Sequence, residues 1–166
     1  MNPAGGYMDM QWMSWTNLYP YVRASNIAIQ KLTANEGGLA AGLTKRLLGE
    51  AYFMRGYLFS QLMRQFGGIV LLTEPLTLDS EAENPRSSFE ATVNQIVSDL
   101  DQAISLLADA PPSKARAHKL TAHALKSRVL THAASDLYDA TKNGGVSTLA
   151  GLSLIHISEP TRPSSI

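Results

Sequence analysis

Apolar residues recur at three- or four-residue steps along this chain, which is the spacing of one face of an α-helix. The clearest case is the stretch 39–66, whose apolar face comprises Leu43, Leu47, Ala51, Met54, Leu58 and Leu62. Gly67 and Gly68 follow, and glycine readily adopts the positive φ that a helix exit often needs. The pattern predicts a long amphipathic helix over 39–66 that ends at the glycine pair.

The same periodicity predicts three more helices. One covers about residues 11–32, one opens at Ser87 and stops before Pro111, and one covers about 119–141. Ser87 and Glu90 have the spacing of a capping box, in which each side chain bonds the other residue's backbone amide. The expected buried positions are Leu18, Val22, Ser25, Ile29 and Leu32 in the first; Val93, Ile96, Val97, Leu100, Ala103, Ile104 and Leu107 in the second; and Ala122, Leu125, Val129, Ala133 and Leu137 in the last.

The connections between these helices complete the predicted fold. Residues 69–73 form a short β-prone run, and 74–85 read as a loop. Adjacent helices are expected to form two antiparallel hairpins, the first helix with the second and the third with the fourth. The predicted fold class is therefore all-α, with hairpins of tetratricopeptide-like type, although the sequence shows no 34-residue repeat.

Composition narrows the classes of function. Among 166 residues, 14 Lys and Arg balance 14 Asp and Glu, which argues against nucleic acid as a partner because nucleic-acid binders usually carry a clustered basic excess. The chain has no cysteine, so it contains neither a disulfide nor a thiolate metal site. No run reaches the roughly 18 apolar residues of a membrane span, and the first ten residues do not resemble a signal peptide.

Residues that could carry catalysis are few. His118, His123 and His132 are separated by five and nine positions, so no two have the i, i+4 spacing of a helical metal pair. Asp99 and Asp101 point in different directions on one helix. There is no phosphate-binding glycine loop and no nucleophile elbow. We therefore expect no enzymatic activity, no metal and no cofactor.

The charged residues within the helices are expected to form ion pairs that fix the hairpins. The expected pairs are Arg55 with Glu50, and Asp99 with Arg86 or Arg128.

An aromatic cluster is the best candidate for ligand binding. It comprises Tyr7, Trp12, Trp15, Tyr19 and Tyr21, at the start of the chain and the head of the first helix. Flat aromatic rings stack on the C–H faces of sugars and bury a large area. The alternative is that these rings pack the hairpin core, which is the favoured interpretation for Trp15 and Tyr19. The candidate ligand-binding residues are Tyr7, Trp12 and Trp15.

Four blocks of sequence, taken in order, resemble the SusD/RagB family. They are WTNLYPYVRASNIAI with Trp15, Arg23 and Asn26; GEAYFMRGYLFSQLMRQFGG with Glu50, Arg55 and Gly67–Gly68; PRSS leading to Asp99, Leu100 and Leu107; and residues 121–138. Two departures are local. The family usually has proline shortly after the glycine pair, where this chain has Ile69, and Gly56 replaces an alanine.

The resemblance implies a function and a location. SusD/RagB proteins are non-catalytic outer-membrane lipoproteins of Bacteroidota that bind glycans or other nutrients and deliver them to a TonB-dependent transporter. It implies a surface-exposed location at the cell outer membrane, with the export signal and lipidation cysteine encoded upstream. The predicted amphipathic hairpins are also compatible with a cytoplasmic helical-hairpin adaptor that binds protein partners, since such hairpins form adaptors as well as nutrient-binding proteins. A helical glycan-processing enzyme would need convergent carboxylates that the sequence does not indicate.

The end of the sequence has a different origin. LSLIHISEPTR, residues 152–162, matches the translation of a transposase adapter used to prepare sequencing libraries. We therefore expect 1–151 to be a truncated, partial SusD-like helical domain and 152–166 to be an artefact that is excluded from structural reasoning.

Overall fold

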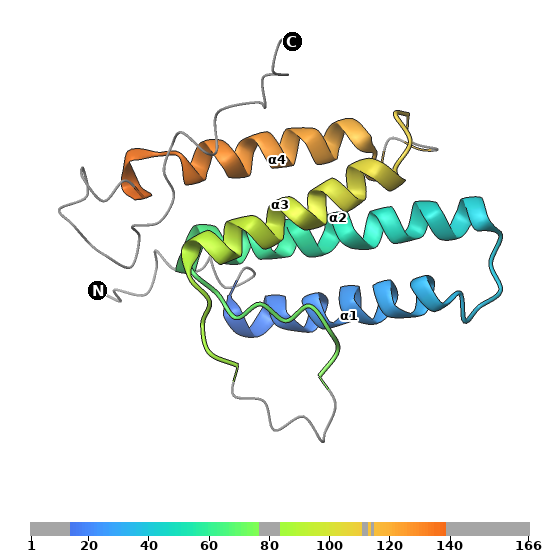
Figure 1. The fold of residues 1–166 in the computed structure, drawn as a ribbon, viewed down its shortest axis with the longest axis horizontal. Coiled ribbons are helices and arrows are strands. Elements are labelled where there is room, and N and C mark those ends of the chain that lie inside the picture. The colour runs from blue at the N-terminus through green and yellow to red at the C-terminus, as the bar shows by residue number, and fades with distance from the viewer. Residues whose placement is uncertain (1–13, 77–83, 111–112, 114, 139–166) are drawn as a thin grey trace, which may run out of the picture.

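The computed structural model describes residues 14–76, 84–110, 113 and 115–138. These residues form the α-helices α1 (Trp15–Ala34), α2 (Ala41–Phe66), α3 (Phe89–Leu106) and α4 (Lys119–Ala133), followed by the short 3₁₀-helix η3 (Asp136–Tyr138). Successive helices run antiparallel, and α1 packs on α2, α2 on α3 and α3 on α4 (Figure 1). The prediction of an all-α fold of stacked hairpins is confirmed.

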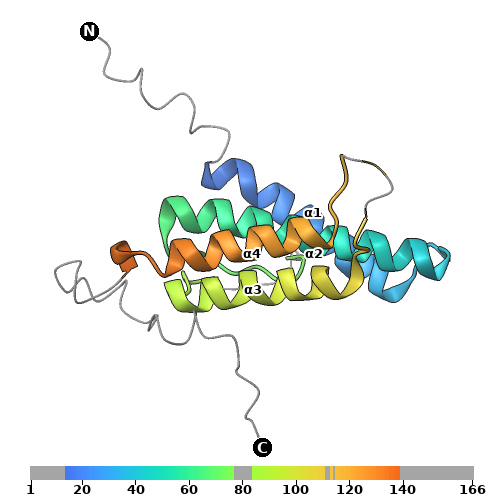
Figure 2. The ribbon, with the colours of Figure 1, turned by 90° about the horizontal axis from the view of Figure 1, so that it is seen from above.

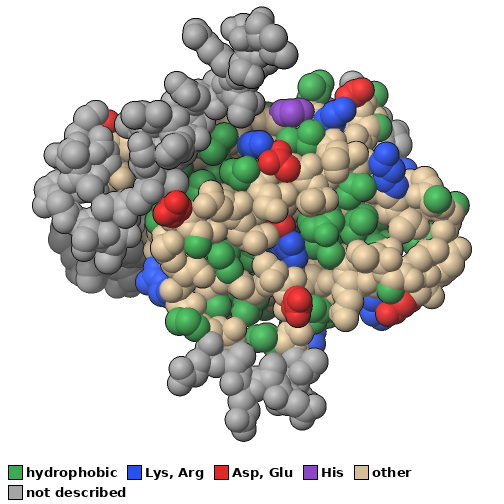
Figure 3. All heavy atoms as spheres, viewed as in Figure 1, with side chains coloured by type: hydrophobic (Ala, Val, Ile, Leu, Met, Phe, Trp, Pro, Cys, Tyr) green, Lys and Arg blue, Asp and Glu red, His purple; other side chains and the backbone are tan. Residues whose placement is uncertain are grey.

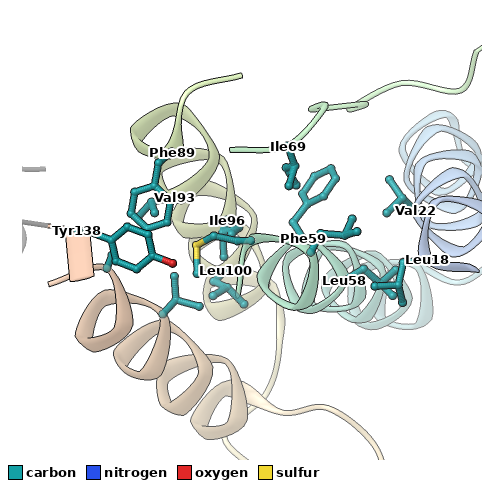
Figure 4. Close-up of a cluster of buried hydrophobic side chains, with 14 residues drawn as sticks. Leu18, Val22, Leu58, Phe59, Ile69, Phe89, Val93, Ile96, Leu100 and Tyr138 are labelled. Carbon is teal, nitrogen blue, oxygen red and sulfur yellow. The ribbon is translucent and has the colours of Figure 1, made fainter. Parts of the chain in front are cut away.

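The core is centred on α2, which lies between its neighbours (Figure 2). On the face of the molecule seen in Figure 3, acidic and basic side chains are interspersed among hydrophobic ones. Beneath the surface, Phe59, Leu62 and Met63 of α2 are fully buried, together with Ile96 and Leu100 of α3. Figure 4 shows this cluster continuing to the α1 side chains on one side of α2 and to α3 and α4 on the other. Because α2 is covered from several sides, it buries side chains on more than one of its faces.

The predicted apolar face of α2 is therefore only partly correct. Ala51, Leu58 and Leu62 are buried as expected, whereas Met54 is 46% exposed and Leu43 is 36% exposed. Both side chains lie on a part of α2 that its neighbours leave open. The prediction of a single apolar face also missed Phe59 and Met63. It assumed that α2 packs against one helix, whereas α2 contacts three.

Both of the first two helices end at a residue with positive φ, as predicted for the glycine pair after α2. Asn35 closes α1 with a positive φ of 50°, and Gly67 closes α2 with a φ of 71°. Gly68 has a different role, since a Cβ atom built there would lie 2.1 Å from the carbonyl oxygen of Ser87. The glycine pair therefore ends α2 and then lets the chain pass close to the start of α3.

The start of α3 lies one residue later than predicted. Ser88 is the N-cap, and its Oγ accepts a hydrogen bond of 3.0 Å from the amide of Ala91. The amide of Ser87 instead donates to the carbonyl of Ile69 at 2.8 Å. The predicted capping box of Ser87 with Glu90 is wrong because Ser87 is engaged by the segment that follows α2.

α4 is shorter than predicted and ends at Ala133. The chain then turns through η3, and the ring of Tyr138 stacks on Phe89 of α3 with centroids 3.8 Å apart (Figure 4). Tyr138 is buried, whereas Leu137, which a longer helix would have buried, is 57% exposed. The aromatic stack replaces the extra helical turn.

Candidate functional site

A buried arginine joins the three helices α1, α2 and α3. Arg55 of α2 donates to Asp99 of α3 through Nε at 2.8 Å and through an η nitrogen at 2.6 Å, in the two-pronged geometry of strong guanidinium–carboxylate pairs. Its other η nitrogen donates to Asn26 Oδ1 of α1 at 3.0 Å and to the carbonyl of Thr73 at 2.9 Å. Gln95 also donates to Asp99 at 3.0 Å. Arg55 is only 5% exposed and Asp99 only 1%, so this network is part of the scaffold.

The segment 68–74, which leaves α2 and passes along α1 in Figure 1, is held by its carbonyl oxygens. Residues 69–73 of this segment were predicted to be β-prone, but no part of the described structure is a strand, and donors from other elements satisfy the backbone acceptors of the segment. The donors are, in order along the segment, Arg86 to Gly68, the Ser87 amide to Ile69, Tyr19 to Val70, Asn26 to Leu72, Arg55 to Thr73, and Asn26 to Glu74.

Arg55, Glu50 and Asp99 form ion pairs as predicted, but with partners other than the predicted ones. Arg55 pairs with Asp99, and Glu50 pairs with Arg116 in the connection before α4, with Arg116 Nε donating at 2.8 Å. This hydrogen bond to Glu50 raises the pKa of Arg116. Arg86 donates to the carbonyls of Phe66 and Gly68. The prediction of Arg55 with Glu50, and of Asp99 with Arg86 or Arg128, is therefore wrong.

A groove of about 750 Å³ lies beside this network, between α1, α2 and the end of the extended segment. Arg55 lies at its inner wall with its donors already engaged. The remaining polar lining is neutral apart from Glu74, and the ring of Tyr52 lies beside the Arg55 guanidinium, 5.4 Å from centroid to carbon. The lining residues are Asn26, Ile29, Gln30, Thr33, Ala34, Tyr52, Arg55, Thr73, Glu74 and Pro75. We call this the α1 groove. Its chemistry suits a neutral ligand that both donates and accepts hydrogen bonds.

The aromatic residues at the head of α1 pack on each other and on the end of α2. The Trp15 ring lies 4.8 Å from that of Tyr19 and 5.3 Å from that of Phe66, centroid to centroid, and the Arg86 guanidinium lies 5.9 Å from Trp15. Burial raises the pKa of Tyr19 to about 12. Trp15 is half-buried, so part of its surface stays accessible. Tyr7 and Trp12 lie outside the described residues, and ligand binding by these three aromatics stays a prediction.

The histidines take packing and capping positions. His118 is the N-cap residue of α4: its backbone amide donates to Thr121 Oγ1 at 2.9 Å, and its ring Nδ1 lies 2.9 Å from the same oxygen. His132 Nε2 lies 3.2 Å from the hydroxyl of Tyr138, whereas His123 is exposed. Burial lowers the pKa of His132, and the charges of Arg64 and Arg128 lower it further. In the part of the chain that the structure describes, no group of three His, Asp or Glu side chains is placed to hold a metal ion.

The lowered pKa of His132 predicts a loss of stability in mild acid. The unfolded chain binds a proton near pH 6.5 and the folded chain only below it, so stability is fully present above about pH 6.5 and falls as the pH drops toward the folded-state pKa. Urea unfolding followed by circular dichroism at about pH 7.5 and 5.5 measures this change. His132→Gln should shrink the difference between the two midpoints, and an unchanged difference would show that other groups cause it.

The family to which this fold belongs follows from the sequence match. A family model described as SusD-like, "Starch-binding associating with outer membrane", matches residues 6–130. The chain belongs to this SusD-like family.

Similar proteins share this assignment. A SusD-like protein of Bacteroides fragilis is 31% identical with a TM-score of 0.63, over 81% of this chain and 25% of its own. A laminarin binding SusD-like protein has the same fold at 24% identity and a TM-score of 0.65, over 81% of this chain and 28% of its own. SusD-like protein P38 of Formosa agariphila is 29% identical over 94 residues, which are 56% of this chain and 18% of that protein. The SusD-like chain thus spans between 18% and 28% of the length of these relatives.

The Arg55 network joins residues from three of the sequence blocks that resemble SusD/RagB proteins. Asn26, Arg55 and Asp99 come from the first three blocks that resemble SusD/RagB proteins, and the fold brings them together. Sequence reasoning named all three residues but missed their convergence. The sequence signal for this network was a polar residue at a helical position that the packing of the helices then buries.

Among the helices that the structure describes, none is long and apolar enough to cross a membrane.

Proposed function

We propose that this SusD-like protein binds glycans at the outer-membrane surface, without chemical conversion, and delivers them to a TonB-dependent transporter. The observation that supports this most directly is the family match over residues 6–130, whose description combines starch binding with association with the outer membrane. The fold shared with a laminarin binding SusD-like protein is consistent with it. The transporter partner and the surface-lipoprotein location follow from the family resemblance.

The structure supports the glycan proposal through the chemistry of the α1 groove. Sugar hydroxyls both donate and accept hydrogen bonds, and the side chains of Gln30, Thr33 and Glu74 in the groove offer both functions. Tyr52 adds an aromatic surface to the same groove. Trp15 at the first turn of α1 and, earlier in the sequence, Tyr7 and Trp12 are the proposed stacking residues.

A binding experiment with matched variants tests this proposal. In affinity electrophoresis through gels that contain laminarin, starch or xyloglucan, the chain is expected to be retarded by at least one polysaccharide. Trp12→Ala should weaken retardation roughly tenfold and Gln30→Ala a few-fold, by loss of one stacking surface and one hydrogen-bonding side chain. Gln102→Ala, an exposed glutamine on α3, is the control for Gln30→Ala and should leave retardation unchanged.

Two outcomes would count against the proposal. Passage through every gel without retardation would contradict glycan binding. Release of shorter oligosaccharides during incubation would show catalysis. Co-purification with a TonB-dependent transporter from outer-membrane extracts tests the partner. Association with cytoplasmic proteins in its place would favour the adaptor alternative.

A further inference from the structure

A second groove lies between α2 and α4, away from the α1 groove. It has a volume of about 370 Å³, and its lining residues are Ser60, Gln61, Met63 and Arg64 of α2 with Leu125, Arg128, Val129, Thr131 and His132 of α4. Its apolar lining includes Met63 and Val129, which are buried, and Leu125. Gln61, only 4% exposed, adds a buried amide. The volume lies near the lower end of the range of roughly 300–1,000 Å³ typical of small-molecule sites.

The basic side chains of this α2–α4 groove converge from two helices. Arg64 comes from α2, and Arg128 and His132 come from α4, where they are four residues apart and therefore on the same face. Both arginines are close enough to His132 to lower its pKa. Among the described residues that line the groove there is no carboxylate. The groove is thus a locally cationic site on a chain whose formal net charge is +0.

We propose that the α2–α4 groove binds an acidic sugar, a uronic acid residue whose carboxylate pairs with Arg64 and Arg128. Planar guanidinium groups match the two oxygens of a carboxylate, so two of them on facing helices favour this anion over a neutral hydroxyl group. The apolar surface of Leu125 and Val129 suits the C–H face of the sugar ring. The hydroxyl of Thr131 offers a hydrogen bond to the sugar hydroxyls, and Gln61 Oε1 accepts from Arg64 at 3.4 Å, which helps to hold that guanidinium beside the groove.

This inference rests on the proposed glycan-binding function and narrows the class of ligand to saccharides that carry uronic acids. The two grooves of this chain would then bind sugars of different charge. The α1 groove, with neutral polar groups and Glu74, suits uncharged sugars, whereas the α2–α4 groove suits acidic ones.

The test compares three probes on the whole 166-residue chain. D-galacturonate, D-galactose and acetate are titrated while amide resonances are followed by NMR. Galacturonate should shift resonances of α2 and α4 around the groove and bind at least tenfold more tightly than either control, because galactose lacks the carboxylate and acetate lacks the ring. Arg64→Gln and Arg128→Gln should each weaken galacturonate binding roughly tenfold. Arg23→Gln, on an exposed part of α1, is the matched control and should not.

Each contrary result has a distinct meaning. Galacturonate binding that survives both arginine substitutions, or that acetate equals, would overturn the inference. If neutral polysaccharides are bound while galacturonate is not, this inference fails and the proposed glycan function stands. If no saccharide of either kind is bound, the proposed function fails with it. Heteronuclear spectra of the variants with unchanged dispersion exclude unfolding as the cause of any loss.

Discussion

Asp99→Ala is expected to lower the free energy of unfolding by about 3–5 kcal/mol, the cost of leaving one partner of a buried ion pair without its counter-charge. Arg55 would keep its positive charge at a position that is only 5% exposed, without the carboxylate that balances it. Since whole domains are stable by roughly 5–15 kcal/mol, this loss is a large part of the total. Urea unfolding followed by circular dichroism measures it.

The chain offers a matched control on the same helix. Asp101 lies two residues further along α3 and also pairs with a cation, Lys126 at 2.6 Å, but its side chain is 51% exposed. Asp101→Ala is expected to cost about 1 kcal/mol or less, because water screens exposed pairs. The double variant Arg55→Met with Asp99→Leu should recover much of the loss, as a hydrophobic pair needs no counter-charge. Equal effects of Asp99→Ala and Asp101→Ala would contradict the structural role of the Arg55 network.

Gly68→Ala is the second large effect and is expected to cost about 3 kcal/mol or more, at the upper end of overpacking changes. The added Cβ would lie 2.1 Å from the Ser87 carbonyl oxygen and 3.2 Å from the Phe89 nitrogen, so the backbone at the start of α3 must move. Because the contact is with backbone, no side-chain rotation relieves it. The expected result is a lower urea midpoint and weaker near-UV circular dichroism from the displaced aromatic side chains.

Alanine substitutions at two other glycines, Gly67 and Gly42, distinguish this clash from the other effects of replacing a glycine. Gly67→Ala meets open space, but the position has a φ of 71° and a ψ of −119°, so it should cost only the conformational strain, about 1–3 kcal/mol. Gly42→Ala, inside α2 with no atom within 4 Å of the added Cβ, should stabilise by about 0.5–1 kcal/mol through helix propensity. If all three variants lost the same stability, the close approach at Gly68 would not be the cause.

The helices were predictable because each depends on contacts close in sequence. The stripe of α3, from Val93 through Ile96 and Leu100 to Ala103, is buried as its periodicity predicted. The ends of α1 and α2 follow from the ability of Asn35 and Gly67 to adopt positive φ values.

The polar partners were not predictable in the same way. Arg55 and Asp99 are 44 residues apart, and only the stacking of α2 on α3 brings them together. Sequence spacing favoured Glu50 as the nearer partner of Arg55, but that residue faces Arg116. The β propensity of residues 69–73 was also a poor guide, since donors from other elements took the place of a neighbouring strand.

The way in which residues 70–74 are held makes the path of this stretch depend largely on its main chain. Tyr19, Asn26 and Arg55 contact its main-chain oxygens, which every amino acid supplies. Leu71 and Leu72 also pack on the core, but at the remaining positions the identity of the side chain matters less to the path of the chain than the three donors do. Mutational drift can alter the outward surface of the stretch, and with it whatever that surface meets, while the helices beneath keep their arrangement.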